Sequence, residues 1–247
     1  MTCSQSEFDI RCEWGEQGVA HLAPLSDVVV IVDVLSFSTS VDIATSRDAM
    51  IFPSRWTDVS ATVFAASVGA IVADARRGSP GYSLSPQSLV HLPHGTRLVL
   101  PSPNGATLTL GTGMVPTLAG CLRNAQAVAA AAQRYGPRIA VIPAGERWPS
   151  DGSLRPALED WVGAGAIINH LAGALSPEAQ AAATTFRGVQ SDLPGLLQSC
   201  GSGQELLARG FATDVALASA LNVSTCVPVF RDGAYVQQGN HVLRSPS

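Results

Sequence analysis

Lysine is absent from the 247-residue sequence, so all fifteen basic residues are arginines. Walker-type phosphate loops, Schiff-base enzymes and pyridoxal attachment sites all need a lysine, and these classes are therefore excluded. Arginine still suits the binding of phosphate or carboxylate, because its planar guanidinium donates two parallel hydrogen bonds. Only 14% of the residues are charged and the formal net charge is −4. We therefore expect no general attraction to nucleic acid or to an anionic membrane.

Long apolar runs are also missing. No stretch approaches the roughly 20 apolar residues that a membrane helix needs. The first residues are polar and charged, without an apolar core, so we expect no secretory signal. The five cysteines have no CxxC or Cys/His metal spacing, which is typical of reduced thiols. These features predict a soluble cytoplasmic protein.

Several catalytic motifs are absent as well. There is no GxSxG nucleophile elbow, no paired DxD after the first strand and no GxGxxG dinucleotide turn. The five histidines lack HExxH or similar spacing, and we assign them ordinary structural or surface roles. The chemistry must therefore come from carboxylates, hydroxyls, amides and arginines.

The stretch from Val28 to Ser40 is the one around which the sequence is organised. It begins as a β-branched run, the pattern of a strand buried on both faces, and breaks at Asp33 into a hydroxyl-rich turn before a helix. This pattern places Asp33 at the carboxyl end of a central strand, beside a helix N-terminus suited to phosphate and to Mg²⁺. The alternative is that the hydroxyls only cap the helix and that Asp33 is a loop acid.

Apolar strands followed by polar turns recur along the first two thirds of the chain. Repeated alternation of strand and helix predicts an α/β fold, a layered α/β/α arrangement with a largely parallel or mixed sheet. The second half is mostly helical, including a helical stripe from Leu158 to Leu175. Because there is no linker or repeat, we predict a single domain over residues 1–247, with two lobes as an alternative. The predicted strands include Phe8–Ile10 at an edge, Ala49–Phe52, Ala70–Ala73, Arg97–Leu100, Met114–Leu118, Arg138–Pro143 and Val227–Phe230.

Acidic side chains follow these strands at positions that a metal or a proton transfer could use. They are Asp33, Glu146 and the adjacent pair Glu159 and Asp160. Mg²⁺ needs only one or two carboxylates in addition to water and substrate phosphate. The alternative for the adjacent pair is a favourable interaction with the helix dipole in the first turn.

Two arginines, Arg123 and Arg147, lie near the ends of predicted strands and could bind anionic oxygens. The alternative for each is a surface salt bridge. The irregular segment from Arg76 to Gly95 is interpreted as a functional loop or, alternatively, as a surface excursion.

Six blocks of the sequence resemble the 2-phosphosulfolactate phosphatase family. This resemblance implies Mg²⁺-dependent hydrolysis of the phosphate ester of a small 2-hydroxy acid, with (R)-2-phospho-3-sulfolactate as the family's substrate in coenzyme M biosynthesis. Such a substrate has three anionic groups, in agreement with an arginine-lined pocket. The blocks are DVLSFSTS at Asp33–Ser40, SPNGATL at Ser102–Leu108, CLRNAQAVA at Cys121–Ala129, PAGER at Pro143–Arg147, LEDWVGAGAII at Leu158–Ile168 and GQELLARGFATDVALASALN at Gly203–Asn222.

The sequence departs from the family pattern at three places. Ser36 and Phe37 stand where DVLRAST is expected, which removes an arginine beside the phosphate turn. A GER-like element and a later NSP are replaced at Ala75 and Leu84, which removes one carboxylate and one amide. A lost arginine contact of roughly 1.5–3 kcal/mol changes substrate preference by about tenfold or more.

The first hypothesis is a Mg²⁺-dependent phosphatase acting on a small phosphorylated hydroxy acid. Asp33 and one of Glu146, Glu159 or Asp160 would hold the metal or position water, and Arg123 and Arg147 would neutralise charge on the transferred group. The second hypothesis is a phosphoester-binding protein that keeps the fold without the metal chemistry. A homodimer is compatible with both. The predicted substrate-binding residues are Ser36, Ser38, Thr39, Asn104, Gly105 and Asn124.

Overall fold

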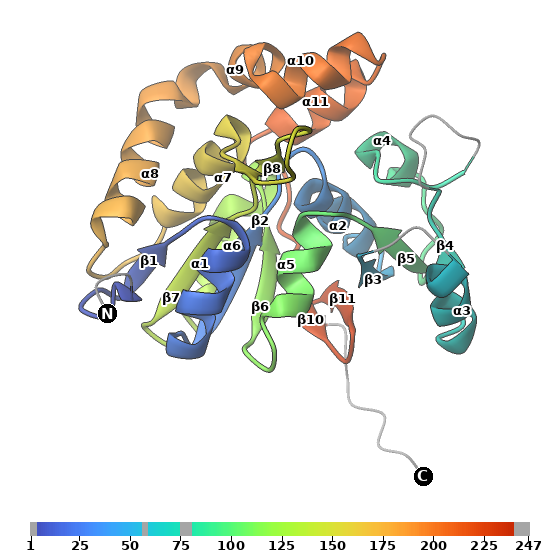
Figure 1. Cartoon of the computed structure of the whole chain (residues 1–247), viewed down its shortest axis with the longest axis horizontal. Helices are drawn as coiled ribbons and strands as arrows, with labels where there is room; N and C mark the ends of the chain where they lie inside the picture. The colour runs from blue at the N-terminus through green and yellow to red at the C-terminus, as the bar shows by residue number, and fades with distance from the viewer. Residues whose placement is uncertain (1–3, 56–58, 75–80, 240–247) are drawn as a thin grey trace.

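One mixed sheet forms the centre of the molecule. The computed structural model describes residues 4–55, 59–74 and 81–239. Within these residues nine strands form the sheet, in the order β1-β7-β2-β6-β10-β11-β3-β5-β4 (Figure 1). In this order the strands are β1 (Ile10–Cys12), β7 (Ile139–Pro143), β2 (Val28–Val32), β6 (Thr117–Gly120), β10 (Pro228–Arg231), β11 (Ala234–Gln237), β3 (Met50–Ser54), β5 (Arg97–Pro101) and β4 (Ile71–Val72).

The sheet consists of two parallel groups joined by an antiparallel hairpin. Strands β1, β7, β2 and β6 run parallel to one another, as do β3, β5 and β4. The hairpin β10–β11 lies between the groups and pairs antiparallel with β6 on one side and with β3 on the other. The expectation of a layered α/β fold with a largely parallel or mixed sheet is confirmed, and the sheet is mixed.

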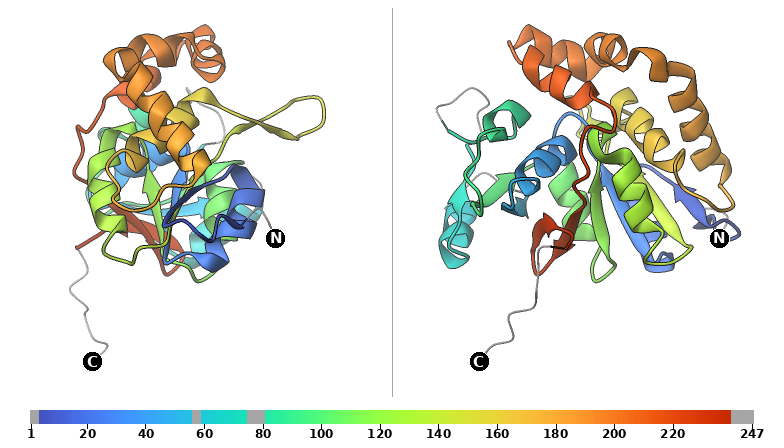
Figure 2. Two further views of the ribbon diagram at one scale, coloured as in Figure 1. Left: turned by 90° about the vertical axis from the view of Figure 1, so that its left-hand side faces the viewer. Right: turned by 180° about the vertical axis from the view of Figure 1, so that it is seen from behind.

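Strand β2 is buried on both faces, as its β-branched run predicts. Val28, Val30 and Val32 pack against helices α6 (Ala125–Ala132) and α7 (Leu158–Ile168). Val29 and Ile31 pack on the other face against α1 (Gly15–Leu22) and α5 (Gly105–Gly111). Figures 1 and 2 show these two helical layers on opposite sides of the sheet.

The other group of strands has its own helical cover. Helix α2 (Phe37–Thr45) packs against Ile51 and Leu98, and α3 (Val59–Ser67) packs through Ala65 on the opposite face of β5. The irregular segment contains the short helix α4 (Pro86–Leu89). Residues 75–80, which include Ala75, lie outside the described residues.

The helix-rich second half is confirmed. Helix α8 (Pro177–Val189) begins at Ser176, whose Oγ accepts a hydrogen bond from the Ala179 amide at 3.1 Å, and it packs along α7. Helices α9 (Leu193–Ser199), α10 (Gly201–Ala208) and α11 (Ala212–Ser219) lie beyond the end of β2 that carries Asp33 (Figure 1). No helix among the described residues is both long and apolar enough to cross a membrane.

Some element boundaries differ from the prediction. The helix expected to continue to Leu175 ends at Ile168, and the chain then turns at Gly173, where φ is +143°. The strand expected at Met114–Leu118 is Thr117–Gly120 instead, because the tight turn before it includes Gly113 at φ +65°. The strand β11 was not predicted.

Candidate active site

Asp33 is held in the turn between β2 and α2 by two backbone amides. Its Oδ1 accepts a hydrogen bond from the Phe37 amide at 3.0 Å, and its Oδ2 accepts one from the Gly105 amide at 2.9 Å. The carboxylate is almost fully buried. Hydrogen bonds from amides favour the ionised form of a buried carboxylate, so this geometry suits a fixed negative charge.

The hydroxyls of the same turn brace its backbone. Ser38 Oγ accepts from the Asp33 amide at 3.0 Å and donates to the Ile31 carbonyl at 3.1 Å. Thr39 Oγ1 donates to the Val34 carbonyl at 2.7 Å. Ser36 precedes α2 and is buried, with no side-chain cap on the helix. Phosphate binding by these three hydroxyls stays a prediction.

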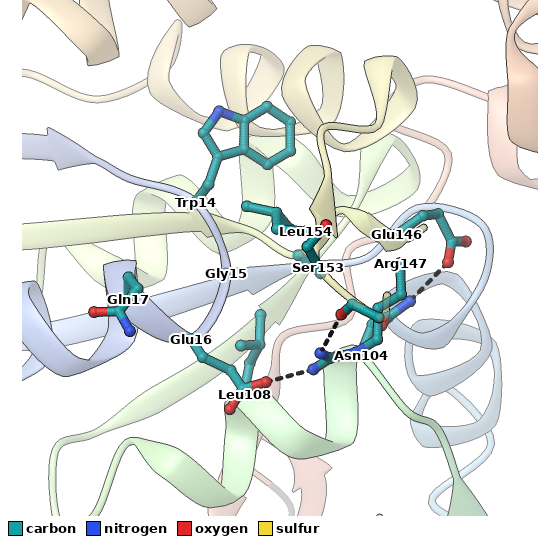
Figure 3. A pocket seen from close by; sticks show the side chains of 12 residues that line it. Trp14, Gly15, Glu16, Gln17, Asn104, Leu108, Glu146, Arg147, Ser153 and Leu154 are labelled. Atoms are coloured by element: carbon teal, nitrogen blue, oxygen red, sulfur yellow. Dashed lines mark hydrogen bonds and ion pairs between the residues drawn. The ribbon is translucent and has the colours of Figure 1, made fainter. Parts of the chain in front are cut away.

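The turn between β5 and α5, which contains Asn104 and Gly105, closes onto Asp33. A Cβ atom on Gly105 would lie 2.3 Å from Phe37 Cδ1 and 2.8 Å from Asp33 Oδ2, so only glycine allows this approach. Asn104 Nδ2 donates to Glu146 Oε2 at 2.9 Å (Figure 3). The structure thus brings Asp33, Asn104, Gly105 and Glu146 together.

Glu146 lies where a proton could be exchanged with a ligand. Burial and, to a smaller extent, the charge of Asp33 raise the pKa of its carboxyl to about 7, against the opposing effect of the hydrogen bond from Asn104. A carboxyl that titrates near neutrality can both hold and release a proton at physiological pH. Glu146 is therefore the best-placed acid or base among the predicted residues.

Asp160 connects the turn that follows β2 to the turn that follows β7. Its Oδ1 accepts from the Val34 amide at 2.7 Å and its Oδ2 from the Gly145 amide at 2.8 Å, so it ties the turn after β2 to the turn after β7. Burial and the charges of Asp33 and Glu159 raise the pKa of Asp160. The neighbouring Glu159 is buried and accepts a hydrogen bond from Cys200 Sγ at 3.4 Å.

These carboxyl groups place several negative charges close to one another. Each of Asp33, Glu146 and Glu159 contributes to raising the pKa of Asp160. Among the described residues, no three His, Cys, Asp or Glu side chains form a preformed metal-binding group. Mg²⁺ retains several waters and needs only one or two protein carboxylates, so the donor set here fits that ion.

The two predicted arginines are both engaged in ion pairs. Arg123 Nε binds Asp42 Oδ2 at 2.9 Å, and its Nη1 donates to the Leu217 carbonyl at 3.1 Å. Arg147 pairs with Glu16 and donates from Nη1 to the Gly152 carbonyl at 3.2 Å.

Arg123 therefore contacts α2 and α11. Arg147 instead lines a pocket next to helices α1 and α5. Asn124 is fully buried and bonds backbone and thiol groups, including the Cys121 amide at 2.9 Å, and also the Asp42 carboxyl. The roles predicted for Arg123 and Asn124 toward a ligand stay predictions.

A third arginine near the site, Arg155, was not identified from the sequence. Residues 146–155 form a hairpin of β8 (Glu146–Arg147) and β9 (Leu154–Arg155), in which Arg155 stands directly opposite Glu146. The hairpin projects from the body of the molecule (Figure 2, left). The available signal was the sequence WPSDGS, which is typical of a turn between two short strands.

A pocket of about 280 Å³ lies between this hairpin and helices α1 and α5. Asn104, Glu146 and Arg147 supply polar groups to it, and Trp14 and Leu154 supply apolar surface (Figure 3). A concave site with a few convergent polar groups is the usual form of a small-molecule site.

Comparison with known proteins places this arrangement in a family. Residues 17–233 match the family described as 2-phosphosulpholactate phosphatase. The chain belongs to this family. A 2-phosphosulfolactate phosphatase of Methanothermobacter thermautotrophicus is 30% identical over 210 residues, covering 84% of this chain and 88% of that protein. A "probable 2-phosphosulfolactate phosphatase" of Carboxydothermus hydrogenoformans is 30% identical over 224 residues, covering 88% and 90%.

A third relative, a "probable 2-phosphosulfolactate phosphatase" of Gloeobacter violaceus, is 38% identical over 84 residues, 34% of each chain.

Of the three departures from the family pattern, two fall on described residues. Ser36 is buried at the start of α2, and the Leu84 carbonyl accepts a hydrogen bond from Ser40 Oγ at 3.0 Å. Both positions therefore lie against α2.

Proposed function

We propose that this protein is a Mg²⁺-dependent phosphatase that hydrolyses the phosphate ester of a small anionic 2-hydroxy acid, of the 2-phosphosulfolactate type. The observation that carries the proposal is the Asp33 carboxylate, fixed by the amides of Phe37 and Gly105 next to the protonatable Glu146. Membership of the family and the names of the relatives support the choice of substrate.

The ion would be held by Asp33, with Glu159 as the second carboxylate. When bound, Mg²⁺ supplies positive charge that offsets the negative charge of a phosphate group. Asp160 links the turn after β2 to the turn after β7 through the Val34 and Gly145 amides, and we assign it to fixing these two turns in place.

The protein's own groups would orient the ester and move the proton. Glu146 would accept a proton from the attacking water or return one to the leaving oxygen, since its pKa is about 7. Asn104 both bonds Glu146 and borders the pocket, so it would orient Glu146 toward the ester. Arg147 would contact the phosphoryl oxygens.

The test is phosphate release from purified protein with a panel of phosphorylated 2-hydroxy acids, in Mg²⁺ and in chelator. We expect release from 2-phosphosulfolactate that needs Mg²⁺ and that falls at least about a hundredfold in Asp33→Asn, in the range for losing a fixed charge or donor at an active site. Asp48→Asn is the matched control, because Asp48 has φ +58°, a conformation that asparagine also adopts.

Three results would change the proposal. Release from another ester of the panel alone would alter the substrate. Full activity in Asp33→Asn would remove Asp33 from the mechanism. Tight binding of the esters without release, in folded protein with Mg²⁺, would favour a phosphoester-binding protein instead, which the departures at Ser36 and Leu84 also suit.

A further inference from the structure

We propose that Arg155 binds the acid group of the substrate that is not transferred, the carboxylate or sulfonate that remains on the product. This inference rests on the proposed function, because it concerns the same site. It assigns to Arg155 the selection of phosphate esters that carry a second acid group over those that do not.

Electrostatics require such a residue. The site already contains four carboxyl groups that interact with one another, namely those of Asp33, Glu146, Glu159 and Asp160. A ligand with further anionic groups would be repelled unless a cation faced them. The phosphoryl group and the metal can offset each other, but the remaining acid group needs a partner from the protein.

The two arginines first considered are less suited to this task. Arg123 would have to leave Asp42, which is fully buried and would then be an unpaired charge. Arg147 already pairs with Glu16 and lines the pocket, where the proposed function assigns it to the oxygens of the transferred phosphoryl group.

Arg155 has the placement that the task needs. It is the cross-strand partner of Glu146, so both side chains lie on the same face of the hairpin. Its positive charge acts on the Glu146 carboxyl. At its far end, Nη1 lies 3.0 Å from the position that a Cβ atom would take on Gly201, the first residue of α10. The side chain of Arg155 therefore reaches from the strand position opposite Glu146 to the first turn of α10.

The first turn of α10 adds two features that suit an anion. The first amides of a helix have no partner within the helix, and they carry the positive end of its dipole. Ser202, in that turn, is 5% exposed, and its Oγ has no hydrogen-bond partner among the described residues. An anion held by Arg155 next to this turn would meet donors on both sides.

The ion pair between Arg155 and Glu205 does not prevent Arg155 from binding an acid group of a ligand. Arg155 Nη2 lies 3.4 Å from Glu205 Oε1, and the Glu205 side chain is 67% exposed while that of Arg155 is 19% exposed. A long ion pair with one solvent-exposed partner is weak, and the other contact of the guanidinium is with the exposed Trp148 ring, 5.8 Å from its centre. The Arg155 guanidinium can exchange Glu205 for a ligand acid group without leaving a buried charge unpaired.

The experiment compares three substrates in four proteins. The substrates are 2-phosphosulfolactate, 2-phospholactate, which lacks the sulfonate, and p-nitrophenyl phosphate, which has no second acid group. The proteins are the wild type, Arg155→Gln, Arg155→Lys and Glu205→Gln. Arg155→Gln should raise KM for 2-phosphosulfolactate at least about tenfold, with a much smaller change in kcat. The rise in KM for p-nitrophenyl phosphate should be several times smaller. In Arg155→Lys, the rise in KM for 2-phosphosulfolactate should be smaller than in Arg155→Gln.

Glu205→Gln is the matched control, because it removes the same ion pair while keeping Arg155. It should leave KM unchanged or lower it. Equal defects in Arg155→Gln and Glu205→Gln, or an equal penalty for all three substrates, would mean that the ion pair only supports the hairpin and would overturn the proposal. Circular dichroism of each variant verifies folding.

Calorimetry separates this proposal from the proposed function. Sulfolactate and inorganic phosphate are titrated separately into the wild type and Arg155→Gln, with Mg²⁺ present. Weaker sulfolactate binding with unchanged phosphate binding supports the role of Arg155, even if the wild type releases no phosphate from any ester and the proposed function fails. Equal sulfolactate affinity in both proteins, or none in the wild type, overturns it.

Discussion

At the scale of single residues, the site depends on one carboxylate, that of Asp33, which accepts one hydrogen bond from its own turn and one from a distant part of the chain. Asp33 could be predicted because it interrupts a β-branched run. Its contact with the Gly105 amide, 72 residues further along the chain, could not be predicted, since no local pattern reports it. The same holds for Arg155, which becomes relevant only because a two-residue strand pairs it with Glu146. Residue types could thus be identified from sequence, but not the bonds between them.

Glu146 predicts a measurable dependence of stability on pH. Its pKa is raised from 4.5 to about 7 in the folded protein. The unfolded chain therefore releases this proton at lower pH, and the folded state loses stability as pH rises from about 4.5 to 7. Glu146→Gln should remove this loss, and should raise the free energy of unfolding above pH 7 by about 1–3 kcal/mol relative to the wild type.

The measurement is urea unfolding of both proteins in chelator at pH 5 and pH 8. The gain from Glu146→Gln should be larger at pH 8 than at pH 5. A gain that is the same at both pH values would show that Glu146 titrates normally and is not held by burial near Asp33.

At the scale of elements, helices and strands with strong local patterns were predicted, and those set by packing were not. The strand β2 and the helix that starts at Pro177 follow from β-branched and capping residues. The helix α7 stops at Ile168 although an apolar stripe continues to Leu175, because Leu175 forms a bridge with Ile10 beside the edge strand β1. That tertiary contact overrides the local helical pattern.

The pair α7 and α8 gives the clearest prediction at this scale. A Cβ atom on Gly165 would lie 2.1 Å from the Ala182 carbonyl oxygen, so Gly165→Ala must push the two helices apart. We expect a loss of about 1–3 kcal/mol of stability, despite the better helix propensity of alanine. Gly188→Ala in α8 is the control, because no atom lies within 4 Å of its Cβ position. The control should be neutral or slightly more stable in thermal unfolding, and equal losses in both variants would contradict the packing explanation.

At the scale of the whole molecule, the unpredicted feature is the way the sheet is completed. A last strand near Val227–Phe230 was predicted, but not its place in the middle of the sheet between β6 and β3. Strand order depends on pairing between segments far apart in sequence, which hydrophobic patterns do not encode. The hairpin is also attached to the core by Tyr235, which is fully buried, lies 6.1 Å from the Phe37 ring and bonds Thr109 at 2.8 Å.

Tyr235→Ala should therefore destabilise both groups of strands together. We expect a loss of about 3–5 kcal/mol, as for other buried aromatic residues replaced by alanine, and a loss nearer 1 kcal/mol in the control Tyr235→Phe. Circular dichroism reports the whole chain, and fluorescence of the four tryptophans, which include the stacked pair Trp14 and Trp161, reports mainly the half that contains β7 and β2. The two signals should change at one common, lowered urea concentration. A fluorescence transition that stays at the wild-type midpoint would mean that the halves unfold separately as two lobes.

The central position of the hairpin also matters while the protein is being synthesised. The ribosome synthesises β2, β3, β5, β6 and β7 long before residues 228–237. Until then, the edges of β6 and β3 that pair with the hairpin have no partner strand. Unpaired edges of this kind readily pair with other chains. The nascent chain is therefore most prone to aggregation in the interval before the hairpin emerges from the exit tunnel. Slow translation or stalling just upstream of residue 228 should lower the yield of folded protein more than stalling at any earlier point.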